Sequence, residues 1–300
     1  MTHLAPLQPG DRVALVAPSS PFARETYETM RAALEARGYS TAPGKHSGRA
    51  VGYLAGTDVE RAEDLIHAIT DPNVAAVFCI RGGYGSGRLL PWLPFSSLAP
   101  HRKIFVGHSD ITFLHTAFTS LMGWTTFLGP NLVDAAAIEG GLDGLLRAFF
   151  SGAHFSWNIQ QSQVLKDGTA TGRLFGGNLT CFAHLIGTPF FPNLDGTLLL
   201  LEDRGEAPYR LDRMLTHLKL AGVIDRLGGL LLGQFSDCGD MELVTEMFLD
   251  ILRPFSFPIV GGLPFGHTDQ NEVIPLGACY SLNTYEGFVR IQQSPFHSES

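Results

Sequence analysis

The chain has 300 residues, of which 45% are hydrophobic, and a net charge of −8, which suits one large domain or two of ordinary size. The acidic balance argues against a nucleic-acid-binding protein, because such proteins normally present a basic face. No apolar run is long enough to cross a bilayer, and the 34 glycines and 18 prolines indicate tight turns rather than disorder.

The beginning of the chain has no basic segment followed by a long apolar one, so we expect no signal peptide. The four cysteines lie far apart and form no C-x-x-C pair. Scattered cysteines of this kind are typical of buried thiols in a reducing compartment. The sequence therefore predicts a cytoplasmic protein that binds neither membrane nor nucleic acid.

The first half of the chain alternates apolar runs with amphipathic segments. The patterns predict strands at 12–18, 74–80, 103–107 and 125–129, and helices at 22–38, 58–72 and 110–123. Continuous apolar strands that alternate with helices predict a parallel sheet covered on both faces. Ligands of such sheets bind beyond the carboxyl ends of the strands, so we expect a site at those ends.

The segment 150–172 is polar and has no helical periodicity, which predicts a connection between two domains. The segments after it predict strands at 197–203 and 229–235, helices at 207–222 and 241–255, and a hairpin at 279–293. We therefore expect an N-terminal α/β domain at 1–155, a linker at 156–171 and an α+β domain at 172–300.

Ser109 stands where the predicted strand 103–107 gives way to a helix, in the sequence GHSD. This placement is similar to the nucleophile elbow of α/β-hydrolases, although the elbow pattern G-x-S-x-G needs glycine where Ile111 stands. The alternative is that Ser109 only caps the helix. Asp110 can serve as the cap instead, and Gly107 permits a strained turn. We therefore interpret Ser109 as a candidate nucleophile, with the backbone N–H of Asp110 as an oxyanion donor.

The glycine-rich loop 81–87 follows the predicted strand 74–80. No G-K-[ST] follows it and the G-x-G-x-x-G spacing fails, so it is not a phosphate-binding loop. It either simply turns the chain or brings backbone N–H groups to a substrate carbonyl. In the second case Gly83, or Gly82 with a different turn, completes an oxyanion hole with Asp110.

A serine nucleophile needs a base, and the base needs an orienting acid. His267 lies in a loop directly after a predicted strand, whereas the other candidates adjoin the serine or fall in predicted helices, where packed imidazoles are expected: His108, His115, His184 and His217. Neither H-x-x-H nor H-E-x-x-H occurs, so we expect no metal.

Glu202 is the candidate for the orienting acid. It ends an apolar strand, where a carboxylate must be paired.

The alternative interpretation of Glu202 is a salt-bridged turn before a helix. Asp203 and Glu206 follow Glu202 in that turn, and three arginines are close enough in sequence to pair with these carboxylates: Arg204, Arg210 and Arg213.

With Ser109, Glu202 and His267 in view, the chain resembles the LD-carboxypeptidase family, which includes murein tetrapeptide LD-carboxypeptidases and microcin-immunity peptidases. The resemblance is carried by RVALVAPSSP, GYLAGTDVERAEDL, FCIRGGYGSGRLLPWL, VGHSD, FGGNLTCFAHLIGTP, LLLLEDRGEAPYRLDRMLTHL and PFGHTDQNEVIPLG. These stretches follow the family's order and span nearly the whole chain.

The resemblance implies a flavodoxin-like or amidotransferase-like N-terminal domain and a smaller C-terminal domain of swivelling β/α type. It also implies a Ser-His-Glu triad of Ser109, His267 and Glu202, a homodimer, and no cofactor. The implied reaction is hydrolysis of the bond to the terminal D-Ala of murein tetrapeptide during peptidoglycan recycling. One alternative is a microcin-immunity-type peptidase acting on peptidyl or aminoacyl nucleotides, and another is a non-catalytic binding protein of the same fold.

Overall fold

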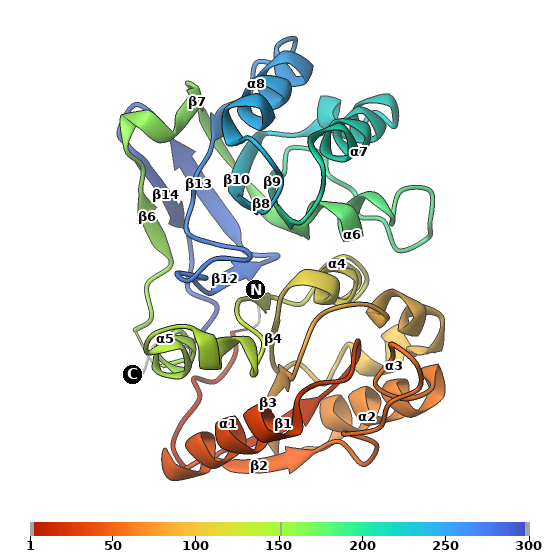
Figure 1. The fold of residues 1–300 in the computed structure, drawn as a ribbon. Coiled ribbons are helices and arrows are strands. Elements are labelled where there is room, and N and C mark those ends of the chain that lie inside the picture. The colour runs from red at the N-terminus through yellow and green to blue at the C-terminus, as the bar shows by residue number, and fades with distance from the viewer. Residues whose placement is uncertain (1–2, 151, 298–300) are drawn as a thin grey trace.

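The structure is a computed structural model that describes residues 3–150 and 152–297. Two α/β domains lie one above the other, each built around its own sheet (Figure 1). The expected fold class, a parallel-sheet N-terminal domain joined to a second α/β domain, is confirmed. Within the described residues, no helix is both long and apolar enough to cross a membrane.

The first sheet has six strands in the order β12-β5-β4-β3-β1-β2. Its strands are β1 (Arg12–Val16), β2 (Ser40–Pro43), β3 (Val74–Cys79), β4 (Ile104–Gly107), β5 (Thr126–Leu128) and β12 (Ile274–Leu276). The helices of this domain are α1 (Arg24–Ala36), α2 (Asp58–Thr70), α3 (Phe95–Leu98), α4 (Thr112–Leu121) and α5 (Gly141–Arg147). The first five strands run parallel, and β12 is added antiparallel to β5 from far along the chain.

The second sheet has eight strands in the order β6-β14-β13-β8-β9-β10-β11-β7. Its strands are β6 (Ser156–Asn158), β7 (Val164–Lys166), β8 (Thr169–Asn178), β9 (Leu198–Arg204), β10 (Gly229–Ser236), β11 (Ile259–Val260), β13 (Cys279–Asn283) and β14 (Phe288–Ile291). Its helices are α6 (Leu179–Ala183), α7 (Pro208–Leu220) and α8 (Met241–Leu252). The strands β8 to β11 are parallel, whereas the remaining pairings are antiparallel.

The connection between the domains is not a free linker along its whole length. Its residues 156–158 form β6, which pairs with β14, and residues 164–166 form β7, which pairs with β11. A short 3-10 helix, Gln161–Gln163, lies between them. The segment between the domains is therefore packed onto the second sheet.

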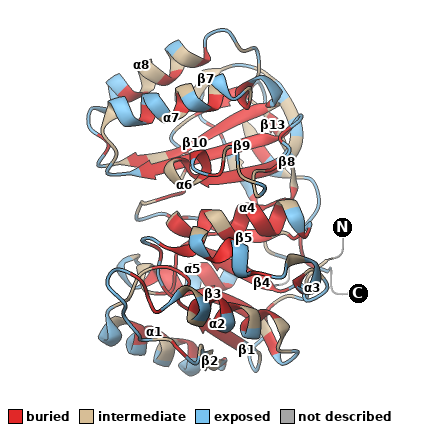
Figure 2. Cartoon of the chain, turned by 90° about the vertical axis from the view of Figure 1, so that its right-hand side faces the viewer, coloured by how far each residue is buried: buried red, intermediate tan, exposed pale blue. Residues whose placement is uncertain are grey.

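Hydrophobic side chains fill both faces of each sheet. Figure 2 shows the strands largely buried, while α1, α2, α7 and α8 carry exposed residues on their outer sides. The last part of the chain also packs on the first domain, since the Phe296 ring stacks on Phe127 at a centroid distance of 5.6 Å. Together with β12, this contact means that the first domain is completed by C-terminal residues.

Candidate active site

Ser109 has a strained backbone. Its φ is 62°, in the left-handed region that non-glycine residues rarely adopt. Strain of this kind costs about 1–3 kcal/mol and clusters at functional sites. The prediction that Gly107 supplies the conformational freedom of this turn is wrong, because Gly107 is the last residue of β4 and has no positive φ. Glycine is needed there for space, since a Cβ would lie 2.9 Å from the side-chain oxygen of Asn131.

The capping role expected for Asp110 is also wrong. Neither the 3-10 helix Ser109–Ile111 nor α4 has a side-chain cap. The buried Asp110 carboxylate instead accepts hydrogen bonds from Ser19 Oγ at 2.6 Å and from the Ser86 N–H at 2.7 Å. Asp110 therefore ties the turn at Ser109 to two loops of the first domain, and within the described residues Ser109 Oγ makes no hydrogen bond of its own.

The glycine-rich loop lies directly against Ser109. A Cβ on Gly82 would lie 3.1 Å from the Ser109 Cβ, and a Cβ on Gly83 would lie only 2.4 Å from Ser20 Oγ. Gly83 also has a φ of 101°, which an L side chain would disfavour. Only a residue without a side chain can approach the serine as closely as Gly82 does, so the glycine-rich loop packs directly on the turn at Ser109.

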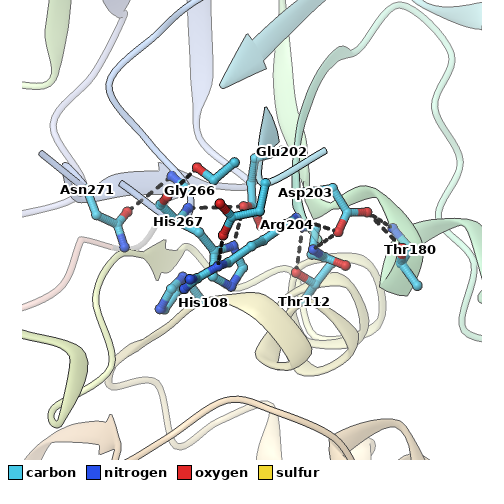
Figure 3. Close-up of polar contacts among 12 residues, drawn as sticks. His108, Thr112, Thr180, Glu202, Asp203, Arg204, Gly266, His267 and Asn271 are labelled. Atoms are coloured by element: carbon cyan, nitrogen blue, oxygen red, sulfur yellow. Dashed lines mark hydrogen bonds and ion pairs between the residues drawn. The ribbon is translucent and has the colours of Figure 1, made fainter. Parts of the chain in front are cut away.

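Glu202 and His267 form a hydrogen-bonded pair at the carboxyl end of β9. His267 Nδ1 lies 2.8 Å from Glu202 Oε2, and Figure 3 shows the two side chains facing one another. An ionised carboxylate only accepts hydrogen bonds, so Nδ1 carries the proton and Nε2 is the basic nitrogen. Burial lowers the pKa of His267, but the hydrogen bond and the charge of Glu202 outweigh it and the pKa is raised.

The salt-bridged-turn interpretation of Glu202 does not hold. Arg204 pairs with Asp237 at 3.0 Å, and Arg210 pairs with Glu206 at 3.4 Å. Glu202 is completely buried, and in the described structure its only ion-pair partner is His267. Gly266 makes this contact possible, because a Cβ there would lie 2.6 Å from Glu202 Oε2.

The two domains are locked together next to these groups. Asn178, at the end of β8, is paired in register with Glu202 on β9. The Asn178 N–H donates to Thr112 Oγ1 at 2.9 Å, and Thr112 opens α4 three residues after Ser109. A single chain of contacts therefore runs from Glu202 through Asn178 and Thr112 to the turn at Ser109.

Ser109 and His267 both line two neighbouring cavities, of about 480 Å³ and about 600 Å³. Gly83 and Arg204 also line both cavities. The structure thus brings Ser109, Gly83 and His267 together around these cavities, while Glu202 is buried and contacts His267. Within the described residues, no group of three or more histidine, cysteine, aspartate or glutamate side chains is placed to hold a metal ion.

His108 belongs to a second hydrogen-bonded pair, which was not predicted from the sequence. Its Nε2 lies 2.8 Å from Asp134 Oδ2, and its ring centroid lies 4.9 Å from that of His267. Burial raises the pKa of Asp134, but its hydrogen bond and ion pair with His108 have the larger, opposite effect. The pKa of Asp134 is therefore lowered. The signal that could have revealed Asp134 is its position shortly after β5, at the same edge of the sheet as Ser109.

The remaining histidines differ in their surroundings. His115 is fully buried, and its nitrogens bond Thr126 Oγ1 and the carbonyl of Gly107, so neither is available as a base. Burial lowers its pKa to about 4. The expectation that His184 and His217 are packed imidazoles was wrong, because both are exposed.

The chain is similar to known proteins over most of its length. Residues 13–129 match the model of the LD-carboxypeptidase N-terminal domain, and residues 171–282 match that of its C-terminal domain. The chain is 36% identical over 294 residues to the probable murein peptide carboxypeptidase of Bacillus subtilis (strain 168), covering 93% of this chain and 91% of that protein. It is 26% identical over 317 residues to the microcin C7 self-immunity protein MccF of Escherichia coli, and the match covers 93% of this chain and 92% of that protein.

Among solved structures, the muramoyltetrapeptide carboxypeptidase from Oxalobacter formigenes is similar with a TM-score of 0.84. The two sequences are 31% identical, and the match covers 95% of this chain and 99% of that one.

Proposed function

The chain belongs to the LD-carboxypeptidase family and is a carboxypeptidase, and from this premise we propose that Ser109, His267 and Glu202 are its catalytic triad. The observation that carries the proposal is that His267, which lines the same cavities as the strained Ser109, is hydrogen-bonded at 2.8 Å to the buried Glu202. The substrate is murein tetrapeptide, and the bond cleaved joins the L-centre of meso-diaminopimelate to the terminal D-Ala. The relatives named for murein peptides support this substrate.

The first half of the reaction forms an acyl-enzyme. His267 Nε2 takes the proton from Ser109 Oγ, and the oxygen attacks the carbonyl carbon of the scissile bond. The N–H groups of Gly83 and Asp110 hold the resulting oxyanion. Glu202 keeps the proton on Nδ1 and stabilises the imidazolium, which then protonates the leaving nitrogen. The C–N bond breaks, D-Ala leaves, and the tripeptide remains as an ester on Ser109.

The second half returns the enzyme to its starting state. Water enters where D-Ala left, and His267 Nε2 takes one of its protons as the oxygen attacks the ester carbonyl. The bond to Ser109 Oγ breaks, and Oγ recovers the proton from His267. The steps use groups of this chain and water only.

A microcin-immunity-type activity on peptidyl or aminoacyl nucleotides is the alternative enzyme function. Members of that branch typically carry an extended substrate loop between the domains. Here the corresponding segment is short and packs as β6 and β7 onto the second sheet, which favours the murein peptide. Assaying the purified protein with murein tetrapeptide and with a peptidyl nucleotide tests the choice. Release of D-Ala is the expected result, and cleavage of the nucleotide alone would overturn it.

A non-catalytic binding role, the other alternative that the resemblance left open, does not fit a chain that is a carboxypeptidase. We further propose that the enzyme acts in peptidoglycan recycling in the cytoplasm and works as a homodimer. We also propose that the chain divides into domains near 155 and 172. The four free cysteines support a reducing compartment, and the family resemblance supports the dimer.

A further inference from the structure

The two cavities that meet at Ser109 and His267 differ in character. The larger, of about 600 Å³, is lined by charged residues such as Arg88, Asp203 and Glu206 and by apolar and aromatic ones: Tyr84, Leu90, Pro91, Phe113, Leu185 and Phe190. The smaller, of about 480 Å³, is lined mainly by polar and charged residues, including Arg81, His108, Asn131, Asp134 and Asp237. Of the two cavities, the larger therefore offers more apolar and aromatic side chains to a substrate bound across the serine.

Several charged groups of the smaller cavity already have partners within the protein, whereas Asp269 makes no ion pair in the described structure. Asp134 pairs with His108 at 2.8 Å, and Arg204 pairs with Asp237 at 3.0 Å. In the described structure Arg81 has no carboxylate partner, and the hydrogen bond of its guanidinium goes to the backbone carbonyl of Pro21. Arg81 is thus an exposed cation that lines the same cavity as Ser109 and makes no ion pair with an acidic side chain of the described residues.

Arg81 also has a fixed position relative to the reacting atoms. It follows β3, which pairs with β4, the strand that leads to Ser109. The next residue, Gly82, lies against Ser109, and Gly83 follows it as the proposed oxyanion donor. Arg81 and Ser109 line the same cavity, so a group joined to the scissile bond by only a few atoms would enter the cavity that Arg81 lines.

We propose that Arg81 binds the terminal carboxylate of the substrate, so that the leaving D-residue occupies the smaller cavity and the acyl part occupies the larger one. This inference rests on the proposed function and adds to it the residue that makes the enzyme remove one terminal residue. A planar guanidinium matches a carboxylate through paired hydrogen bonds. An internal peptide bond offers no carboxylate at that place, so Arg81 disfavours cleavage within a longer chain.

The test compares two substrates that differ only at the terminal group: murein tetrapeptide with a free carboxylate and the same peptide as its C-terminal carboxamide. A charge-assisted contact should give the wild type a kcat/KM ratio of acid to amide of about 10 to 100. In Arg81→Ala this ratio should fall to near 1, and in Arg81→Lys it should be intermediate, because lysine keeps the charge without the planar fork.

Arg204→Ala is the matched control, since Arg204 lines the same cavity but is already paired with Asp237. It should keep the acid preference of the wild type. Loss of the preference in Arg204→Ala but not in Arg81→Ala would overturn the assignment, as would a wild type that cleaves acid and amide equally. If Arg81 only shapes the loop, its replacement lowers both rates in proportion and keeps the ratio, which also contradicts the proposal. A wild type that cleaves neither peptide would instead refute the proposed function.

Discussion

Glu202 Oε2 and His267 Nδ1, which are contributed by residues 65 positions apart, meet at 2.8 Å inside the second domain. The pair needs no contact with the first domain, because Glu202 lies in β9 and His267 follows β11 of the same sheet. Docking of the domains then places it beside Ser109. Activity therefore depends on the pair, on the turn that carries Ser109, and on the contacts that hold the two together.

Glu202→Gln should lower kcat by about 10²–10⁴-fold with little change in the fold. Glutamine keeps the shape but cannot hold the imidazolium, and its amide can present a donor to Nδ1. Steady-state kinetics on murein tetrapeptide measure the effect. Glu206→Gln is the matched control, because Glu206 pairs with Arg210 at 3.4 Å on α7 and lies outside the pair. If Glu206→Gln were the more damaging change, the acid would be misassigned.

The pH dependence of His267 should reveal the same pair. Glu202 raises the pKa of His267 above 6.5 despite the opposing effect of burial. In Glu202→Gln only burial remains, so the pKa should move down, and NMR titration of the His267 ring protons measures this. An unchanged or higher pKa in the variant would mean that Glu202 does not control the imidazole.

The raised pKa also has a consequence for stability. A group whose pKa is higher in the folded protein stabilises it most when protonated. The contribution of His267 is therefore fully present below pH 6.5 and is lost as the pH rises through the raised pKa. The difference in free energy of unfolding between the wild type and Glu202→Gln should shrink over that range, as urea titrations at several pH values can measure.

Asp110→Ala should reduce both stability and activity. The change leaves the Ser86 N–H and Ser19 Oγ buried without their acceptor, which should lower the free energy of unfolding by about 2–4 kcal/mol. Asp110→Asn should be milder, because an amide oxygen can accept both hydrogen bonds. Urea denaturation and kcat measure the two effects.

The control for this change is Asp143→Ala, which breaks an exposed pair with Arg37 and should cost about 0–1 kcal/mol. Equal losses of unfolding free energy in Asp110→Ala and Asp143→Ala would show that the buried contacts of Asp110 stabilise the protein no more than an exposed ion pair does.

Much of the site could be predicted because its residues follow recognisable strands. Ser109 comes after β4 and Glu202 lies within the apolar β9, so an apolar run in the sequence pointed to each of them. The predicted helices at 22–38, 58–72, 207–222 and 241–255 are confirmed with small shifts at their ends. These elements have strong local patterns, and local patterns are what a sequence displays.

The features that were missed depend on contacts between distant residues. The strands β6, β7 and β12 have three residues each, too few to display a period. In addition, β12 contains Pro275, which an edge position tolerates. The Asp110 carboxylate contacts a residue 91 positions away, so its local position at a helix start suggested a cap instead. We predicted the strained backbone at Gly107, but it lies at Ser109. Gly107 is instead packed tightly as the last residue of β4.

Two substitutions of Ser109 should distinguish its role as nucleophile from the cost of its strained backbone. Ser109→Ala should lower kcat by about 10⁴-fold or more, because the nucleophile is lost. Ser109→Gly should also be inactive but should raise the free energy of unfolding by about 1 kcal/mol, since glycine relieves the positive φ. Ser40→Ala, on the exposed edge strand β2, is the matched control and should keep full activity. A loss of only a few-fold in Ser109→Ala would leave the serine without a chemical role.

Covalent capture of the nucleophile tests the triad most directly. A tetrapeptide analogue with a reactive phosphonate ester in place of the scissile carbonyl should form a bond to the attacking oxygen and remain attached. Mass spectrometry of the digested protein should then find one adduct per chain, on Ser109, and the adduct should be absent from Ser109→Ala and form far more slowly in His267→Ala. An adduct on any other residue, or an inhibited wild type that carries no adduct, would contradict the assignment of Ser109 as the nucleophile.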